Sequence, residues 1–123
     1  MIELDCPDEL RAPALAALAA GDLADGHVAV ELVSAERIRQ LNRSHRGIDE
    51  PTDVLAFPID GAAATAGPRE LGDVVICPEH TADLGEAVVH GILHLAGYDH
   101  ETDDGEMLAV QARVLEELRK GAR

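Results

Sequence analysis

The stretch that most constrains the fold is the run from residue 84 to 100, LGEAVVHGILHLAGYDH. Its apolar residues recur at the spacing of a buried helix, and Asp83 and Glu86 have capping-box spacing at its start. His90 and His94 are four residues apart, so on a helix their rings lie on one face, one turn apart. The sequence therefore predicts a buried helix that presents two imidazoles on the same face.

A third histidine follows the expected end of this helix. Gly97 is expected to end the helix and to let the chain turn back, which brings His100 to the side of His90 and His94. Zinc takes ligands about 2 Å away in tetrahedral directions, and three imidazoles leave a fourth position open for water, as in catalytic zinc sites. Burying three unpaired imidazoles in an apolar segment would be costly without a shared partner. We therefore expect one Zn²⁺ per chain, held by these three histidines.

Gly91 stands where the zinc peptidase pattern HExxH has its general base, a glutamate. Glycine inside a helix costs about 1 kcal/mol relative to alanine, so close packing or close approach of a substrate is expected to offset it. Without that carboxylate a metallopeptidase is disfavoured. A phosphodiester is the better substrate, because its transition state carries charge on oxygens that a metal ion and a guanidinium can stabilise.

Four of the ten lysines and arginines lie in one ten-residue stretch, RIRQLNRSHR. They are Arg37, Arg39, Arg43 and Arg46. The ordinary interpretation is a solvated helix face whose arginines pair with nearby acids such as Glu36, with Arg46 paired to Asp49 or Glu50. The phosphodiester hypothesis favours a second interpretation, in which the stretch is a local strip that binds phosphate.

The rest of the chain alternates strand and helix patterns. Strands are predicted at 2–4, 27–34, 53–59 and 71–77, with a small-residue loop at 60–70. Helices are predicted from Pro13 to Ala20, from an N-cap at Ser34, and from Thr102 or Asp103 toward the C-terminus. Met107, Val110, Val114 and Leu118 recur at helical spacing as the core face of the last helix. About four strands with helices packed on them predict an α/β or α+β fold.

Length and composition limit the possibilities further. The 123 residues suit a single domain spanning 1–123, and 46% hydrophobic residues can supply its core. No apolar run approaches the roughly 18 residues of a membrane span, and the N-terminus lacks the pattern of a secretory signal. Cys6 and Cys77 form no CxxC pair and are expected to be small apolar groups. We expect a cytoplasmic protein without a membrane partner.

Net charge and aromatic content limit how the chain can meet nucleic acid. The net charge of −14 repels nucleic acid as a whole, and no DNA partner is expected. Phe57 and Tyr98 are the only aromatic rings besides the histidines, so a base-stacking platform is not expected. RNA would be held through its backbone, weakly and with salt sensitivity, and protein partners would direct it.

Three motifs carry a family resemblance. VVHGILHLAGYDHE, LNRSHRGIDEPTDVLAFP and LGDVVICPE resemble the three motifs of the YbeY family of bacterial endoribonucleases and ribosomal RNA maturation factors. The match extends from Ser34 to Glu106. It implies an α+β fold, with a small four-stranded mixed sheet packed with about four helices and a zinc-binding helix that carries HxxxHxxxxxH.

The resemblance also implies the site and the function. His90, His94 and His100 would hold the zinc ion, and Arg46 takes the place of the family's catalytic arginine. The implied activity is a zinc-dependent, single-strand-specific endoribonuclease in 16S rRNA 3′-end maturation and ribosome quality control. Its partners would be ribosomal RNA and the small ribosomal subunit with its proteins or assembly factors. The expected catalytic residues are Arg46 and His90.

Several alternatives stay open at this stage. Water or a ribose hydroxyl could be the nucleophile, and Asp99 could orient a ligand imidazole or only close a turn. Arg37, Arg39 and Arg43 are expected to contact RNA phosphates. The rival function is a ribosome-assembly factor with a structural zinc and little or no cleavage. One departure from the family is a short segment between Cys77 and His90, where the family carries a longer helical stretch.

Overall fold

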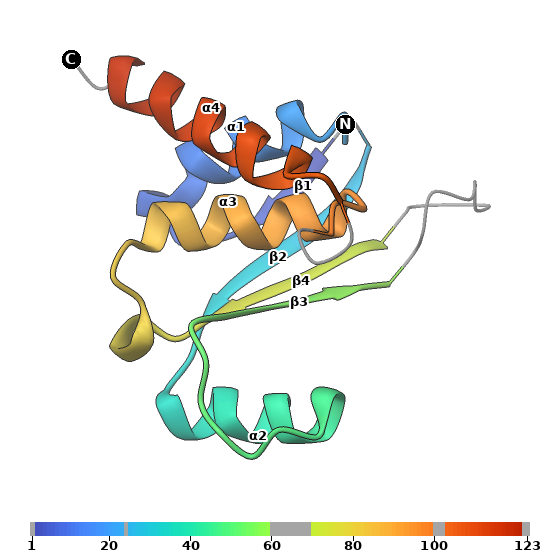
Figure 1. The fold of residues 1–123 in the computed structure, drawn as a ribbon, viewed down its shortest axis with the longest axis vertical. Coiled ribbons are helices and arrows are strands. Elements are labelled where there is room, and N and C mark those ends of the chain that lie inside the picture. Colours follow the sequence, from blue (N-terminus) through green and yellow to red (C-terminus); the bar gives the residue numbers. More distant parts are fainter. Residues whose placement is uncertain (1, 24, 60–69, 100–102, 122–123) are drawn as a thin grey trace.

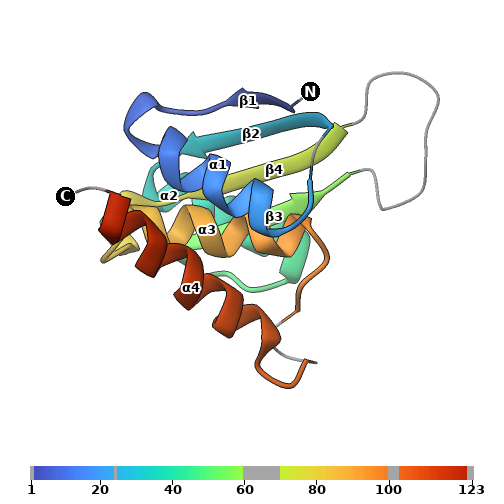
Figure 2. The same cartoon turned by 90° about the horizontal axis from the view of Figure 1, so that it is seen from above.

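A four-stranded mixed sheet organises the chain, and helices cover both of its faces (Figures 1 and 2). The computed structural model describes residues 2–23, 25–59, 70–99 and 103–121. The strands are β1 (Ile2–Asp5), β2 (Gly26–Leu32), β3 (Val54–Pro58) and β4 (Glu70–Ile76). The helices are α1 (Arg11–Ala20), α2 (Ala35–Arg46), α3 (Leu84–Leu95) and α4 (Glu106–Gly121), with short 3₁₀ turns η1 (Asp8–Leu10) and η2 (Pro78–His80).

The strand order is β1-β2-β4-β3. The first three strands in this order are parallel, whereas β3 runs antiparallel to β4 and forms an edge of the sheet. Helices α1, α3 and α4 cover one face, and α2 lies on the other (Figures 1 and 2). The α+β fold with a four-stranded mixed sheet and four α-helices is therefore confirmed for the described part of the chain.

Two apolar clusters follow from this arrangement. The larger lies between the sheet and the helices α1, α3 and α4, and includes the fully buried Val28, Val74 and Ile92. The smaller lies under α2 and is built from Ile38, Leu55, Val75 and Cys77. Side chains on a strand alternate between faces, so neighbouring residues of β3 and β4 serve different clusters.

The expected helix starts are confirmed at Ser34 and Asp83. The Ser34 hydroxyl accepts a hydrogen bond from the Arg37 N–H at 3.1 Å, and the Asp83 carboxylate accepts one from the Glu86 N–H at 3.1 Å. Helix α1 begins at Arg11, so Pro13 is its third residue rather than its first. Of the loop predicted at 60–70, residues 60–69 lie outside the described residues and Glu70 belongs to β4.

The start predicted for the last helix is wrong. Thr102 lies outside the described residues, and α4 begins at Glu106 rather than at Asp103. The Asp103 carboxylate accepts hydrogen bonds from the N–H groups of Gly105 at 2.8 Å and Met107 at 2.9 Å, so it caps the helix from outside. Gly105 has a φ of +93°, which interrupts helical backbone before the first turn.

The short segment between Cys77 and His90 is filled by the turn η2 and the capped start of α3. The Thr81 hydroxyl donates to the Cys77 carbonyl at 2.6 Å, and the Cys77 N–H donates to the Asp53 carbonyl at 2.8 Å. The second of these bonds ties the end of β4 to the start of β3. Helix α3 keeps 12 residues and three full turns, so the shortening does not remove the helix that carries His90 and His94.

No helix in the described ranges is both long and apolar enough to cross a lipid bilayer.

His27 bridges two acids across neighbouring strands and makes stability depend on pH. Its Nδ1 lies 2.8 Å from Glu70 Oε1 and its Nε2 lies 3.3 Å from Asp5 Oδ2. These hydrogen bonds, Glu70 first, raise the pKa of His27 above the value of 6.5 for an unperturbed imidazole. Because the folded state binds this proton more tightly, the contribution is complete below about pH 6.5 and is lost as pH rises through the folded-state pKa.

His27→Gln should therefore cost more unfolding free energy at about pH 5.5 than at about pH 8.5, as measured by urea denaturation. His80→Gln is the matched control, because His80 is exposed and its replacement should cost equally little at both pH values. A cost for His27→Gln that does not change with pH would refute the bridging role.

Candidate metal and phosphate site

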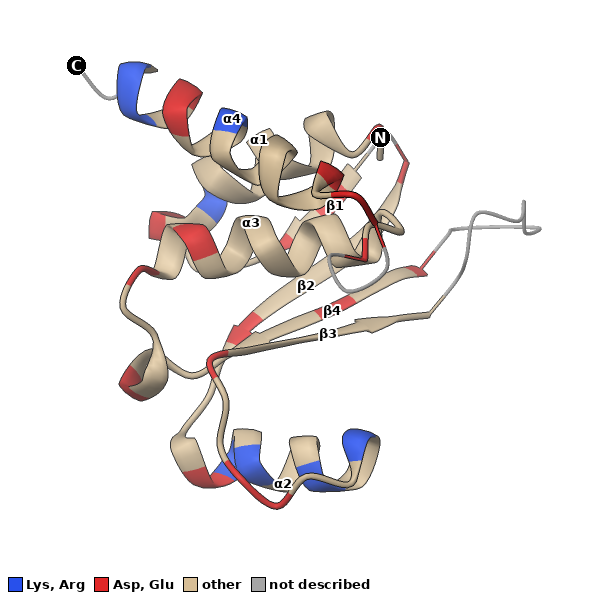
Figure 3. Ribbon diagram, in the orientation of Figure 1, with Lys and Arg blue, Asp and Glu red and all other residues tan. Residues whose placement is uncertain are grey.

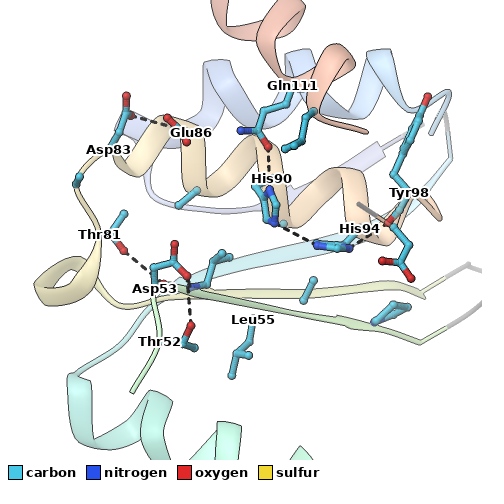
Figure 4. A pocket seen from close by; sticks show the side chains of 18 of the residues that line it. Thr52, Asp53, Leu55, Thr81, Asp83, Glu86, His90, His94, Tyr98 and Gln111 are labelled. Atoms are coloured by element: carbon cyan, nitrogen blue, oxygen red, sulfur yellow. Dashed lines mark hydrogen bonds between the residues drawn. The ribbon is translucent and has the colours of Figure 1, made fainter. Parts of the chain in front are cut away.

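Two imidazoles on α3 point toward each other above the edge of the sheet (Figure 4). His90 Nδ1 lies 2.8 Å from Gln111 Oε1, and His94 Nδ1 lies 3.0 Å from the Tyr98 carbonyl. Both partners are oxygens that only accept, so each Nδ1 carries the hydrogen and donates it. Each Nε2 then presents a lone pair, and these two nitrogens are 3.2 Å apart.

This separation suits two ligands of one metal ion. Two nitrogens at about 2.0–2.1 Å from zinc in tetrahedral directions are roughly 3.3 Å apart. Two facing lone pairs repel each other unless a proton or a cation lies between them. The hydrogen bonds from Nδ1 to an amide or carbonyl oxygen are the orienting contacts that metal-binding histidines commonly have. The pair fits a zinc ion in both distance and tautomer.

The third expected ligand, His100, lies outside the described residues. Among the residues that are described, no group of three or more histidine, cysteine, aspartate or glutamate side chains could hold a metal ion. The structure therefore brings together two of the three predicted ligands.

Gly91 sets the distance between α3 and the sheet. A Cβ atom at this position would lie 2.5 Å from Val74 Cγ1 and 3.2 Å from Val54 Cγ2. Val74 is fully buried on β4, so it has no room to yield. Of the two explanations expected for this glycine, close packing is the one that the structure supports. A side chain at position 91 would point into the sheet.

The histidine pair lines a cleft of about 940 Å³ between α3 and the β3 edge. The other residues that line it come from the end of α2, the strand β3 and the residues just before it, the η2–α3 connection, α3 and the segment that follows it, and α4. Its charged members are one cation, Arg46, and four carboxylates, Asp53, Asp83, Glu86 and Asp99. The cleft is therefore acidic apart from the end where Arg46 lies.

The C-terminal end of α2 determines the position of Arg46. It is the last residue of that helix, and Gly47 follows in the left-handed region with φ +72°, a common helix terminator. The buried Asn42 donates from Nδ2 to the Glu50 carbonyl at 2.9 Å, which ties the next loop back to the helix. Arg46 is exposed and has no ion pair within the ranges that the structure describes.

The other three arginines of α2 have different surroundings, and Figure 3 shows these cations gathered on that helix. Arg39 donates to both carboxylate oxygens of Asp49, at 2.9 and 3.1 Å. This pairing raises the pKa of Arg39 and lowers that of Asp49. Arg37 lines a second hollow, whereas Arg43 lines neither of the two. The sequence suggests Asp49 or Glu50 as a partner for Arg46, but Asp49 pairs with Arg39, and Arg46 pairs with neither acid in the described part of the chain.

The acids near the histidines have structural contacts. Asp53 accepts from the Val54 N–H at 2.8 Å and from the Thr52 hydroxyl at 3.3 Å, so it caps the start of β3. Asp99 is exposed in the cleft, and its carbonyl accepts from the Asp103 N–H at 3.0 Å. The role of Asp99 toward a ligand imidazole stays a prediction.

Gln111 is the residue that sequence reasoning missed. It is 9% exposed on the inner face of α4, four residues after the buried Met107 and three before the buried Val114. A polar residue in that apolar stripe was the available signal, because buried amides normally have a hydrogen-bonding partner. The partner is His90, from a helix distant in the sequence.

The fold and the site define an α+β protein with a histidine pair directed into a cleft beside an edge strand. Residues 12–119 match the family model for Endoribonuclease YbeY, so the chain belongs to the YbeY family. An Endoribonuclease YbeY of Brevibacillus brevis is 41% identical, covering 76% of this chain and 75% of the relative. One from Salinispora tropica is 43% identical, covering 75% and 74%.

The fold comparison agrees with this assignment. The solution structure of TM1509 from Thermotoga maritima is 31% identical in sequence, with a TM-score of 0.55 over 98% of this chain and 93% of that one. The family expected from the three motifs is thus confirmed. The names of the relatives support an endoribonuclease, hence hydrolase, activity.

Proposed function

We propose that this chain is a zinc-dependent, single-strand-directed endoribonuclease that acts in the cytoplasm in 16S rRNA 3′-end maturation and ribosome quality control. The observation that carries the proposal is the pair of Nε2 atoms 3.2 Å apart, directed into a cleft that also holds Arg46. Membership of the YbeY family supports RNA as the substrate class. Ribosomal RNA and the small ribosomal subunit with its proteins or assembly factors are the proposed partners.

His90, His94 and His100 are the proposed ligands of one zinc ion. When bound, the ion would supply Lewis-acid stabilisation of charge on a phosphate oxygen. Gln111 and the Tyr98 carbonyl fix the tautomers of the two ligands on α3, so that Nε2 faces the cleft in both. The proposed contribution of Arg46 is a guanidinium that binds the phosphate oxygens as they gain charge.

The four carboxylates of the cleft oppose the approach of RNA. Asp53, Asp83, Glu86 and Asp99 repel the RNA backbone, and the whole chain carries a net charge of −14. Free RNA should therefore bind weakly and with salt sensitivity, and protein partners at the ribosome would deliver the substrate. Tight binding of naked RNA in physiological salt would contradict this step.

The attacking group is either water or the neighbouring ribose 2′-hydroxyl. The two routes leave different products, and fragments ending in cyclic phosphate identify the hydroxyl. Mass spectrometry of the cleaved ends of a defined oligoribonucleotide distinguishes them.

Metal analysis of the purified chain tests the zinc site directly. We expect close to one zinc ion per wild-type chain and a large loss of zinc in His94→Ala, because Nε2 of His94 would be a direct ligand. His80→Ala is the matched control, since His80 is exposed and lies outside the cleft. Equal zinc contents in wild type and His94→Ala would overturn the assignment.

A ribosome-assembly factor with a structural zinc and little or no cleavage is the second candidate. The excess of carboxylates over cations in the cleft favours it, because such a surface suits a protein partner better than an RNA backbone. The two functions differ in what they require of Arg46, and replacement of that residue separates them.

A further inference from the structure

A second hollow of about 700 Å³ lies on the opposite face of the sheet, between α2 and the strands β3 and β4. Arg37, Leu41 and His45 line it from α2, where their spacing of four places them on one helix face. Leu55 and Phe57 line it from β3. We call this hollow, lined by Arg37, Leu41, His45, Leu55 and Phe57, the α2 groove.

The α2 groove contains a pair of rings. The centroids of His45 and Phe57 are 4.5 Å apart, and their planes are inclined at 47°. Phe57 is half-buried and His45 is exposed, so the pair presents ring surface to solvent. Aromatic and imidazole rings are the usual surfaces on which single-stranded RNA stacks its bases. The scarcity of aromatic residues in the chain had argued against such a surface.

The α2 groove adjoins the cleft that holds the histidine pair. Arg46, Leu55, Ala56 and Pro58 line both hollows, and only the edge strand β3 separates them. A chain that leaves the cleft across β3 therefore passes Arg46 before it enters the α2 groove.

Charge favours this path over the other end of the cleft. The cleft has one arginine against four carboxylates, whereas the α2 groove has Arg37 and Arg46 against Glu31 and Asp73, with His45 in addition. An RNA backbone that crosses β3 thus moves from an acidic surface to one with balanced charge.

We propose that the α2 groove is a subsite for a nucleotide of the single-stranded RNA substrate, next to the one at the histidine pair. The base would lie against the rings of His45 and Phe57, and the phosphate that crosses β3 would lie between Arg46 and Arg37. This subsite rests on the proposed endoribonuclease function. The proposal assigns substrate binding to Arg37. Arg39 is paired with Asp49, and Arg43 lines neither hollow.

The composition of the chain allows a direct test, because it contains one phenylalanine and one tyrosine. Fluorophenylalanine labels only Phe57 in the groove, and fluorotyrosine labels only Tyr98 in the cleft. With a 2′-O-methyl hexauridylate, both ¹⁹F signals should shift with the same concentration dependence. A dinucleotide should shift the Tyr98 signal alone.

The possible outcomes separate the two proposals. A shift of Tyr98 without Phe57 on adding the hexamer would overturn the groove subsite and leave the proposed function standing. A hexamer that shifts neither signal, even at low salt, would count against both.

A kinetic test uses a charge that lies in the groove alone. Arg37→Ala should raise KM for cleavage of a hexanucleotide by about three- to tenfold, the effect of losing one charge-assisted phosphate contact, with kcat unchanged. Cleavage of a dinucleotide should not change. Arg113→Ala removes an exposed arginine of α4 and controls for net charge. Equal effects of the two substitutions on the hexanucleotide KM would overturn the subsite.

Discussion

Replacement of Arg46 by alanine is expected to lower kcat for cleavage of a single-stranded oligoribonucleotide by about 10²–10³-fold, the usual effect of removing one transition-state donor. Folding and zinc content should stay at the wild-type level, because Arg46 is exposed at the end of α2 and makes no ion pair in the described ranges. Initial-rate kinetics, thermal unfolding and metal analysis of the same preparation measure the three quantities.

Two further variants sharpen this experiment. Arg46→Lys should recover part of the lost activity, since it restores the charge but not the planar two-point contact. Arg113→Ala, on exposed α4, should cleave at the wild-type rate. Should Arg46→Ala cleave normally, or should it support rRNA maturation in cells, the assembly-factor function would be favoured over the enzyme.

Gly91→Glu is expected to destabilise the chain by more than about 4 kcal/mol and to produce no peptidase activity. The glutamate found here in zinc peptidases would have its Cβ 2.5 Å from Val74 Cγ1, and its carboxylate would enter the apolar layer between α3 and the sheet. Urea denaturation measures the loss, and casein digestion tests the activity. A stable Gly91→Glu protein that digests casein would refute this explanation of the glycine.

Alanine at two positions of α3 separates packing from helix propensity. Gly91→Ala should lose about 1–3 kcal/mol through overpacking, even though alanine favours the helix by up to about 1 kcal/mol. Gly85→Ala lies in the first turn of the same helix, where the nearest atom to an added Cβ is Asp83 Oδ1 at 3.4 Å. It should be neutral or stabilising, and a loss like that of Gly91→Ala would point to a general effect of glycine replacement.

Local features of this fold were readable from the sequence because they depend on neighbouring residues. Ser34 and Asp83 cap their helices as expected, since a cap needs only an acceptor side chain three residues before a free N–H. The same local signal led to a wrong start for α4. Asp103 is the type of residue that starts a helix, but its carboxylate accepts from the N–H groups of Gly105 and Met107 while Asp103 itself lies outside the helix.

The parts of the site that could not be predicted from the sequence depend on contacts between residues that are distant along the chain. The spacing of His90 and His94 fixes their common face, but nothing local shows that Gln111 orients one of them. Likewise, four arginines on one helix look equivalent in sequence. Only the folded chain shows that Arg39 pairs with Asp49, whereas Arg37 lines the α2 groove and Arg46 lines both that groove and the cleft.

The bond from Gln111 to His90 also sets an order of events during synthesis. Gln111 belongs to α4, which leaves the ribosome after α3, so both imidazoles are translated before it. A helix of 12 residues is marginal by itself in water, so an emerging α3 cannot hold its rings in register. His90 gains the acceptor that fixes its tautomer only after α4 has docked. A nascent chain that lacks α4 would carry both imidazoles without this fixed orientation.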